Sequence, residues 1–135
     1  MTKIVWLVSF ETGFPEIDND HRGLVQSIGL IEEALNADDI ESCLIKINNF
    51  LKLAADHFIR EEAFLISIDF PRLKSHRIAH KILLKMAGDI VKTLKSGLNP
   101  DAIKKCLEEL VYFLLEDVIK ADAEFKSYAQ EKGFI

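Results

Sequence analysis

Three of the four histidines of this chain lie between positions 57 and 80. Glu61 follows His57 by four positions, and His80 follows His76 at the same spacing. Residues four apart project from one face of a helix, one turn above the other. Each pair therefore predicts two metal-binding side chains on one helix, and Pro71 marks the point between them where one helix would end and the next begin. Two such helices facing each other would form half of a metal site.

Two further polar residues interrupt the apolar stripes of the expected helices. His21 and Asp117, like the two pairs, take positions that the helical period assigns to the core. Burying a polar group costs a few kcal/mol unless it is paired, and burying a charge costs more. A metal cluster would satisfy all of these side chains, because each would bind an ion through a lone pair.

The ligand types restrict the metal. Imidazole and carboxylate ligands without thiolate suit iron, manganese, zinc or copper. Carboxylates that can bridge, inside a bundle of four helices, favour two ions and particularly two irons. The periodicity itself leaves the number of ions open.

Each residue also has an ordinary structural interpretation. A lone histidine on an apolar face, such as His21, is usually a core residue bound to a backbone carbonyl. Glu61 alone could lie at the surface, and Asp117 alone could cap the end of a helix. Two core-facing imidazoles one turn apart, as expected for His76 and His80, are uncommon without a ligand. The set as a whole therefore favours a metal site.

Four amphipathic segments are expected to position these side chains. Residues 1–17 are predicted to form an extended arm, and helices are predicted to start near 18–20, after 36–39, at Pro71 and at Asn99-Pro100. Apolar residues recur at helical spacing within each segment. Helices of roughly 20 residues with short connections predict an all-α, antiparallel up-down-up-down four-helix bundle. The tail from 122 to 132 could form a short further helix, and residues 1–135 are expected to form one domain.

Composition and charge narrow the class of protein. The chain has 135 residues, 49% hydrophobic and 29% charged, which is typical of a soluble globular domain. Its net charge of −5 provides no basic face for nucleic acid. No apolar run approaches the ~20 residues of a membrane span, and the N-terminus lacks the features of a signal peptide. Cys43 and Cys106 are far apart, so we expect free thiols and a reducing, cytoplasmic compartment.

The ordered set of motifs resembles the hemerythrin family, specifically the bacterial hemerythrins, over nearly the whole chain. Beside the two pairs, the similarity includes Trp6, the segment Gly13-Phe-Pro-Glu-Ile-Asp-Asn-Asp-His21 and Phe70-Pro71. The resemblance implies two iron ions, bridged by an oxo or hydroxo group, with dioxygen as an end-on ligand of one iron. It also assigns the ligands, with one iron on His21 and His57, the other on His76 and His80, and Glu61 as a bridge.

The family's last motif is a histidine followed five residues later by an aspartate. Here Asp117 stands at the histidine position, and the resemblance makes Asp122 the second bridging carboxylate. Five residues turn a helix by ~140° from the starting direction, so spacing alone would not place both in one site. Phe113, Leu114 and Val118 match positions that line the family's dioxygen pocket.

The substitution at Asp117 has a chemical consequence. Aspartate is shorter than histidine, so it could fall short of the iron and leave a water-filled position. If it reaches the iron, its negative charge favours the ferric ions. Both cases predict that the oxygenated state decays more readily to the ferric form.

Three functions fit these observations. The favoured one is a dioxygen-binding di-iron protein for sensing, storage or transport, because most ligands and the apolar pocket are retained. A di-iron oxidase or peroxidase would use the more carboxylate-rich ligand set. A hemerythrin fold that binds one metal or none is the third. A sensing role would require a protein partner for its output.

Overall fold

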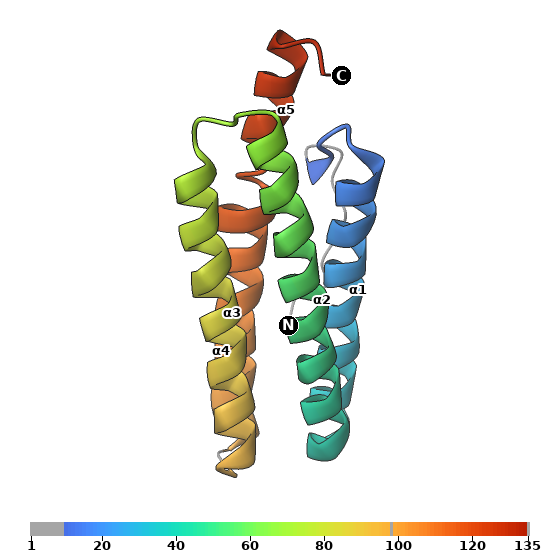
Figure 1. Cartoon of the computed structure of the whole chain (residues 1–135). Coiled ribbons are helices and arrows are strands. Elements are labelled where there is room, and N and C mark those ends of the chain that lie inside the picture. Colours follow the sequence, from blue (N-terminus) through green and yellow to red (C-terminus); the bar gives the residue numbers. More distant parts are fainter. Residues whose placement is uncertain (1–9, 98, 135) are drawn as a thin grey trace.

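The fold is a bundle of antiparallel helices, and the all-α prediction is confirmed (Figure 1). A computed structural model describes residues 10–97 and 99–134, so Trp6 lies outside the described residues. Its elements in chain order are α1 (Pro15–Asn36), α2 (Ile40–Ser67), α3 (Leu73–Lys95), α4 (Pro100–Phe113), the π-helix η2 (Leu114–Ile119) and α5 (Ala123–Glu131). Helices α1 to α4 run alternately up and down, and α5 stands at one end of the bundle (Figure 1). Helix α5 is the short further helix that the sequence predicts between residues 122 and 132.

Two helix starts follow the capping signals in the sequence. The side chain of Asp39 accepts a hydrogen bond from the backbone N–H of Ser42 at 3.0 Å and begins α2. Asn99 accepts from the N–H groups of Asp101 and Ala102 ahead of α4, and Pro100 occupies the first helical position. A side-chain acceptor satisfies backbone donors that have no partner within the first turn.

Two other starts differ from prediction. Helix α1 begins at Pro15, because the fixed φ of proline suits a first helical position. Asp18 therefore lies inside the helix. Its Oδ1 accepts hydrogen bonds from Thr12 N at 2.8 Å and from Thr12 Oγ1 at 2.9 Å, and these bonds attach the segment before α1 to the helix. Helix α3 begins at Leu73 rather than Pro71. Asp69 takes a left-handed φ of 55° at the end of α2, and the turn that follows contains Pro71.

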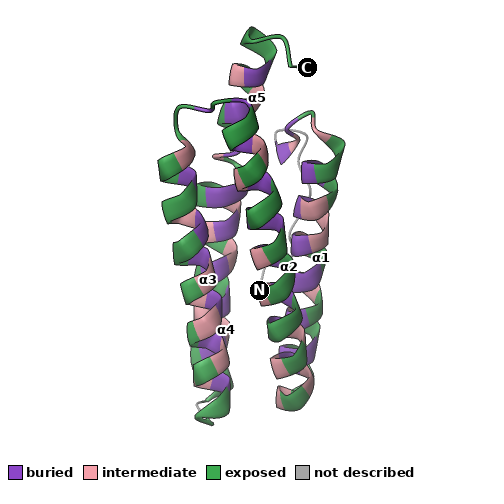
Figure 2. Cartoon of the chain, viewed as in Figure 1, coloured by how far each residue is buried: buried purple, intermediate pink, exposed green. Residues whose placement is uncertain are grey.

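The helix interiors divide into two apolar clusters. The larger one runs along α1 to α4 and includes Ile28, Phe50, Leu83 and Leu107. The smaller one lies where α5 meets the ends of α2 and α3, and is made by Ile17, Leu65, Ile68, Phe70 and Phe125. Buried residues face inward along every helix of the bundle (Figure 2). On each helix the histidines fall between a residue of one cluster and a residue of the other, so they form a polar layer within an apolar core.

The π-helix η2 shifts the register of the fourth helix. The N–H of Lys120 donates to the carbonyl of Leu115, five residues earlier, at 2.9 Å. A π turn accommodates one more residue than an α turn. As a result Val118 and Asp122 are buried, whereas Asp117 is exposed. The prediction that Asp117 faces the core is therefore wrong, because it assumed a continuous α-helical period.

Two further sequence expectations concern thiols and membrane spans. Cys43 on α2 is buried, Cys106 on α4 is half-buried, and both are free thiols, as predicted. None of the helices in the described part of the chain is long and apolar enough to cross a membrane.

Candidate metal centre

Six side chains from helices α1, α2 and α3 and from the turn after η2 converge in the polar layer. His21 comes from α1, His57 and Glu61 from α2, His76 and His80 from α3, and Asp122 follows η2. Each of the six is at most 5% exposed. They include every predicted metal ligand except Asp117.

The six residues form two overlapping groups, each with ligand atoms within 4.8 Å of one another. The first group contains His21, His57, Glu61 and Asp122. The second group contains Glu61, His76, His80 and Asp122. The two carboxylates therefore belong to both groups, and each group contributes two imidazoles of its own.

The two oxygens of each carboxylate face different groups. Glu61 Oε2 lies 2.7 Å from His57 Nε2 and 3.5 Å from His21 Nε2. Glu61 Oε1 lies 3.2 Å from His80 Nε2 and 3.7 Å from His76 Nδ1. Asp122 repeats the arrangement, with Oδ2 at 3.0 Å from His21 Nε2 and Oδ1 at 3.0 Å from His76 Nδ1.

The imidazole nitrogens and carboxylate oxygens of the six residues are better suited to binding a metal than to forming hydrogen bonds with one another. Among the residues that the structure describes, the buried side-chain atoms without a geometrically satisfactory hydrogen bond are both ring nitrogens of His21, Nε2 of His57, His76 and His80, and the carboxylate oxygens of Glu61 and Asp122. Buried polar atoms in folded proteins normally have partners, so such a concentration requires an explanation. Imidazole nitrogens and carboxylate oxygens are ligands for a divalent transition metal. The cluster can therefore hold metal.

The pKa values show how strongly the groups interact when only protons are bound. Burial alone would lower the pKa of His21, but its contacts with the Asp122 and Glu61 carboxylates outweigh burial and raise the pKa to about 10. The same competition raises the pKa of His76 to about 9. Burial would raise the pKa of Glu61, but the surrounding histidines lower it well below its usual value. Burial and the Glu61 charge raise the pKa of Asp122.

Outer carboxylates orient one histidine of each group. Asp20 Oδ2 lies 2.8 Å from His57 Nδ1 and accepts from Arg60 Nη2 at 2.8 Å. This contact places the ring proton on Nδ1 and leaves Nε2 of His57 to face the cluster.

The second group has an equivalent arrangement. Glu62 Oε2 lies 2.9 Å from His80 Nδ1, and Glu62 Oε1 accepts from Arg77 Nε at 3.0 Å. Asp20 and Glu62 are not among the site residues predicted from the sequence. The sequence indicates them in one way, because each stands next to a predicted metal ligand in the chain.

Aromatic rings surround the second group. Phe58 stacks on His80 with ring centroids 3.9 Å apart and an interplanar angle of 6°. Phe70 and Phe125 lie 5.3 Å and 6.1 Å from the His76 ring. These contacts fix the imidazole planes and cover the second group from both apolar clusters, with Phe58 from the larger one and Phe70 and Phe125 from the smaller one.

The remaining predicted site residues lie near the cluster but outside it. Leu114 and Val118 are buried in the larger apolar cluster. Phe113 is half-buried and, with Asp117, lines a cavity of about 650 Å³ whose lining also includes His76. A second cavity, of about 290 Å³, lies between α1 and α2 and is lined by His57 and Glu61.

A helical bundle with two histidine–carboxylate groups at its centre defines a cation-binding domain, and comparison with known proteins identifies the family. Residues 12–127 match the model of the hemerythrin HHE cation binding domain. The chain belongs to the hemerythrin family, a family of non-haem iron, oxygen-binding domains.

Curated relatives agree with this assignment. A bacteriohemerythrin of Clostridium acetobutylicum is 26% identical over 126 residues, covering 90% of this chain and 97% of the relative. A myohemerythrin of Theromyzon tessulatum is 30% identical over 109 residues, covering 78% and 80%. A bacteriohemerythrin of Pseudomonas paraeruginosa is 22% identical over 97 residues, covering 72% and 63%.

Proposed function

We propose that this chain, acting as one domain, is a non-haem di-iron protein that binds dioxygen for sensing, storage or transport. The observation that carries the proposal is the division of carboxylate oxygens between the two groups. Glu61 presents Oε2 to His57 and Oε1 to His80, and Asp122 divides its oxygens in the same way between His21 and His76. A carboxylate with one oxygen toward each of two imidazole pairs is suited to bridging two ions.

The residues of the chain have distinct roles in this proposal. His21 and His57 would hold one iron, His76 and His80 the other, and the two carboxylates would bridge them. When bound, a pair of ferrous ions supplies the electrons that reversible dioxygen binding requires. The apolar clusters on both sides restrict water, and Asp20 and Glu62 keep His57 and His80 in the tautomer that binds metal.

Metal analysis with optical spectroscopy tests the proposal. We expect about two irons per chain when the protein is made with iron, since two ligand groups share two carboxylates. The spectrum should change when the anaerobically reduced protein meets air. Continuous oxygen consumption in the presence of a reductant would instead indicate the oxidase alternative. Folded protein without metal, whose thermal stability does not respond to chelators, would contradict the proposal.

Single-ligand variants connect the metal to these residues. His57→Ala and His80→Ala each remove one imidazole from a different group, so each should lower the iron content. Cys43→Ser and Cys106→Ser provide the matched control, because neither thiol belongs to a ligand group and iron content should be unchanged. The free thiols also support the cytoplasmic location that the sequence predicts.

A further inference from the structure

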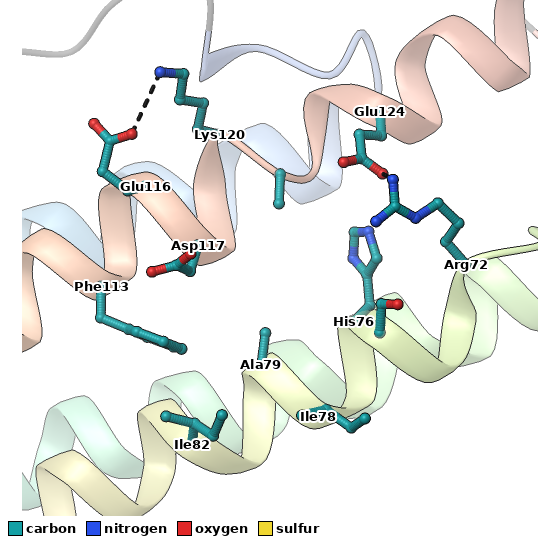
Figure 3. Close-up of a pocket in the computed structure, with 12 residues that line it drawn as sticks. Arg72, His76, Ile78, Ala79, Ile82, Phe113, Glu116, Asp117, Lys120 and Glu124 are labelled. Carbon is teal, nitrogen blue, oxygen red and sulfur yellow. Dashed lines mark hydrogen bonds and ion pairs between the residues drawn. The ribbon is translucent and has the colours of Figure 1, made fainter.

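The cavity between α3 and η2 leads from the protein surface to the second ligand group. Its volume is about 650 Å³, and its facing walls are built mainly by His76, Ala79 and Ile82 from α3 and by Phe113, Asp117 and Ala121. Figure 3 shows Phe113 and Asp117 projecting toward α3, with the His76 ring on the opposite wall. His76 is the member of the second group that lines the cavity, and its Nδ1 lies 3.0 Å from Asp122 Oδ1, so one imidazole separates the cavity from the bridging carboxylate.

The charges on the cavity wall do not balance. Lys120 Nζ pairs with Glu116 Oε2 at 3.3 Å, and Arg72 Nη1 pairs with Glu124 Oε2 at 2.9 Å. Asp117 has no basic partner among the residues that the structure describes. Figure 3 shows the Glu116–Lys120 pair on the side of η2 that faces away from α3, whereas Asp117 faces the cavity. One uncompensated negative charge therefore stands in the path to the second group.

We propose that this cavity is an access route and binding site for small exogenous ligands at the ion held by His76 and His80, and that Asp117 selects uncharged ligands over anions. The inference rests on the proposed di-iron function and adds a ligand site on the second group. Asp117 excludes anions by charge repulsion, and its carboxylate accepts hydrogen bonds from ligands that carry a proton. The α3 wall is half open, because its apolar side chains Ile78 and Ile82 are 51% and 43% exposed.

Azide binding to the ferric, iron-loaded protein tests the charge selection. Asp117→Asn keeps the shape and removes the charge, so azide affinity should rise by about tenfold for one partly screened charge near the ion. Glu116→Gln changes the net charge by the same amount, but at an exposed position on the side of η2 that faces away from α3, where solvent screens it, so azide affinity should change much less. Nitric oxide, an uncharged probe of the reduced protein, should bind wild type and Asp117→Asn with equal affinity. Equal azide affinities in wild type and Asp117→Asn would overturn the selection.

Obstruction of the cavity tests the access route. Ala79→Phe fills the passage, and Ile82→Trp obstructs its exposed rim without entering the core. At least one of these variants, folded and iron-loaded, should slow azide association severalfold in stopped-flow measurements. Glu16→Phe is the matched control, because Glu16 is exposed and lines the other cavity, beside His57. Slower association in Glu16→Phe, with unchanged rates in both α3 variants, would assign access to the other cavity and overturn the proposal.

Iron content, measured in every preparation, distinguishes failure of the proposed ligand site from failure of the proposed di-iron function. Two irons per chain with azide binding that no cavity variant alters would overturn the ligand site alone. Preparations that fold but take up no iron would overturn the proposed function and this inference with it.

Discussion

At the scale of single residues, the geometry of the centre depends on side chains that do not face the cluster. Asp20 and Glu62 each hold Nδ1 of one histidine, and each is itself held by an arginine, Arg60 or Arg77. Partners of this kind fix the ring tautomer and orientation, and their loss typically weakens metal binding by roughly 10–100-fold.

We therefore expect Asp20→Asn to weaken iron binding at the first group by at least about tenfold. The amide is neutral, so it no longer stabilises the Nδ1–H tautomer of His57 as a carboxylate does. Glu62→Gln should have the same effect on the second group through His80. Competition with a chelator measures both affinities. Asp89→Asn is the control, since Asp89 is exposed and its carboxylate pairs with Lys85 on α3. Equal affinities in all three variants would show that Asp20 and Glu62 do not support metal binding.

The same residues show what a sequence can reveal about a site. The ligand pairs were predictable because a spacing of four fixes one helical face, whatever the rest of the fold does. Asp20 and Glu62 were not, because their contacts join α1 to α2 and α2 to α3. Such contacts depend on how two helices pack, and the period of one helix carries no information about that.

At the scale of elements, the π turn decides which residues of the fourth helix enter the centre. Leu110, Leu114, Val118 and Asp122 form a buried row there, with Ile119 buried beside it. Their uniform spacing of four would rotate steadily around an ordinary α-helix, which has 3.6 residues per turn. The extra residue held by η2 absorbs this drift and keeps Asp122 with the histidines. An ordinary α-helical period lacks this extra residue, so it predicts Asp117 instead of Val118 at the core-facing position.

Deletion of Glu116 should convert η2 into an ordinary α-helix and retain the metal. The buried positions would then be spaced four, three and four apart, which suits an α-helix. The lost Glu116–Lys120 pair is exposed and contributes at most about 1 kcal/mol. We expect the midpoint of thermal unfolding to change by less than about 5 °C, with iron content unchanged.

Deletion of Lys85 is the matched control for this experiment. Lys85 also belongs to an exposed pair at the same spacing, but it lies in α3, where no π turn can absorb the change. Its removal rotates Ala87, Ile90 and Leu94 out of the larger apolar cluster. The unfolding midpoint should fall by more than about 10 °C. Similar decreases of the unfolding midpoint in both deletion variants would show that η2 does not accommodate one extra residue relative to an α-helix.

Helix ends were predictable where a side chain supplies the cap. Asp39 and Asn99 are strong local signals, and the structure uses both. Pro71 was a weaker guide, because proline also suits the turn that precedes a helix. The left-handed Asp69 sets the direction in which the chain leaves α2, and this choice depends on how Phe70 packs into the smaller apolar cluster.

At the scale of the whole molecule, the centre links folding to protons and metal. In the metal-free protein His21 and His76, with pKa values of about 10 and 9, are protonated at neutral pH and neutralise the two carboxylates. Metal must displace these protons, because a histidine binds metal through a free lone pair. Metal and protons therefore compete for the same buried cluster that joins all four helices.

The pKa shifts determine whether the stability of the metal-free protein rises or falls with pH, because folding and proton binding are linked. A histidine whose pKa is higher in the folded state contributes stability below its unfolded pKa of about 6.5 and loses it as the pH rises through the folded value. For His21 and His76 this loss extends from about pH 6.5 to about pH 9–10. The raised pKa of Asp122 acts in the same direction at lower pH, since the folded state retains its proton longer. Glu61 acts oppositely, because its lowered pKa contributes stability that is lost only as the pH falls below the usual value.

We therefore expect the metal-free protein to become less stable between pH 6.5 and pH 9, while the metal-loaded protein changes little over this range. The difference between their unfolding midpoints should widen with pH, because metal binds more tightly once protons no longer compete. Metal uptake at pH 7 should also release about two protons per chain, one each from His21 and His76. Calorimetry of both forms, with proton release followed by an indicator dye, measures each quantity. A metal-free protein whose stability is constant or rises over this range, with no protons released, would mean that these histidines are neutral before metal binds and that the buried carboxylates are stabilised in another way.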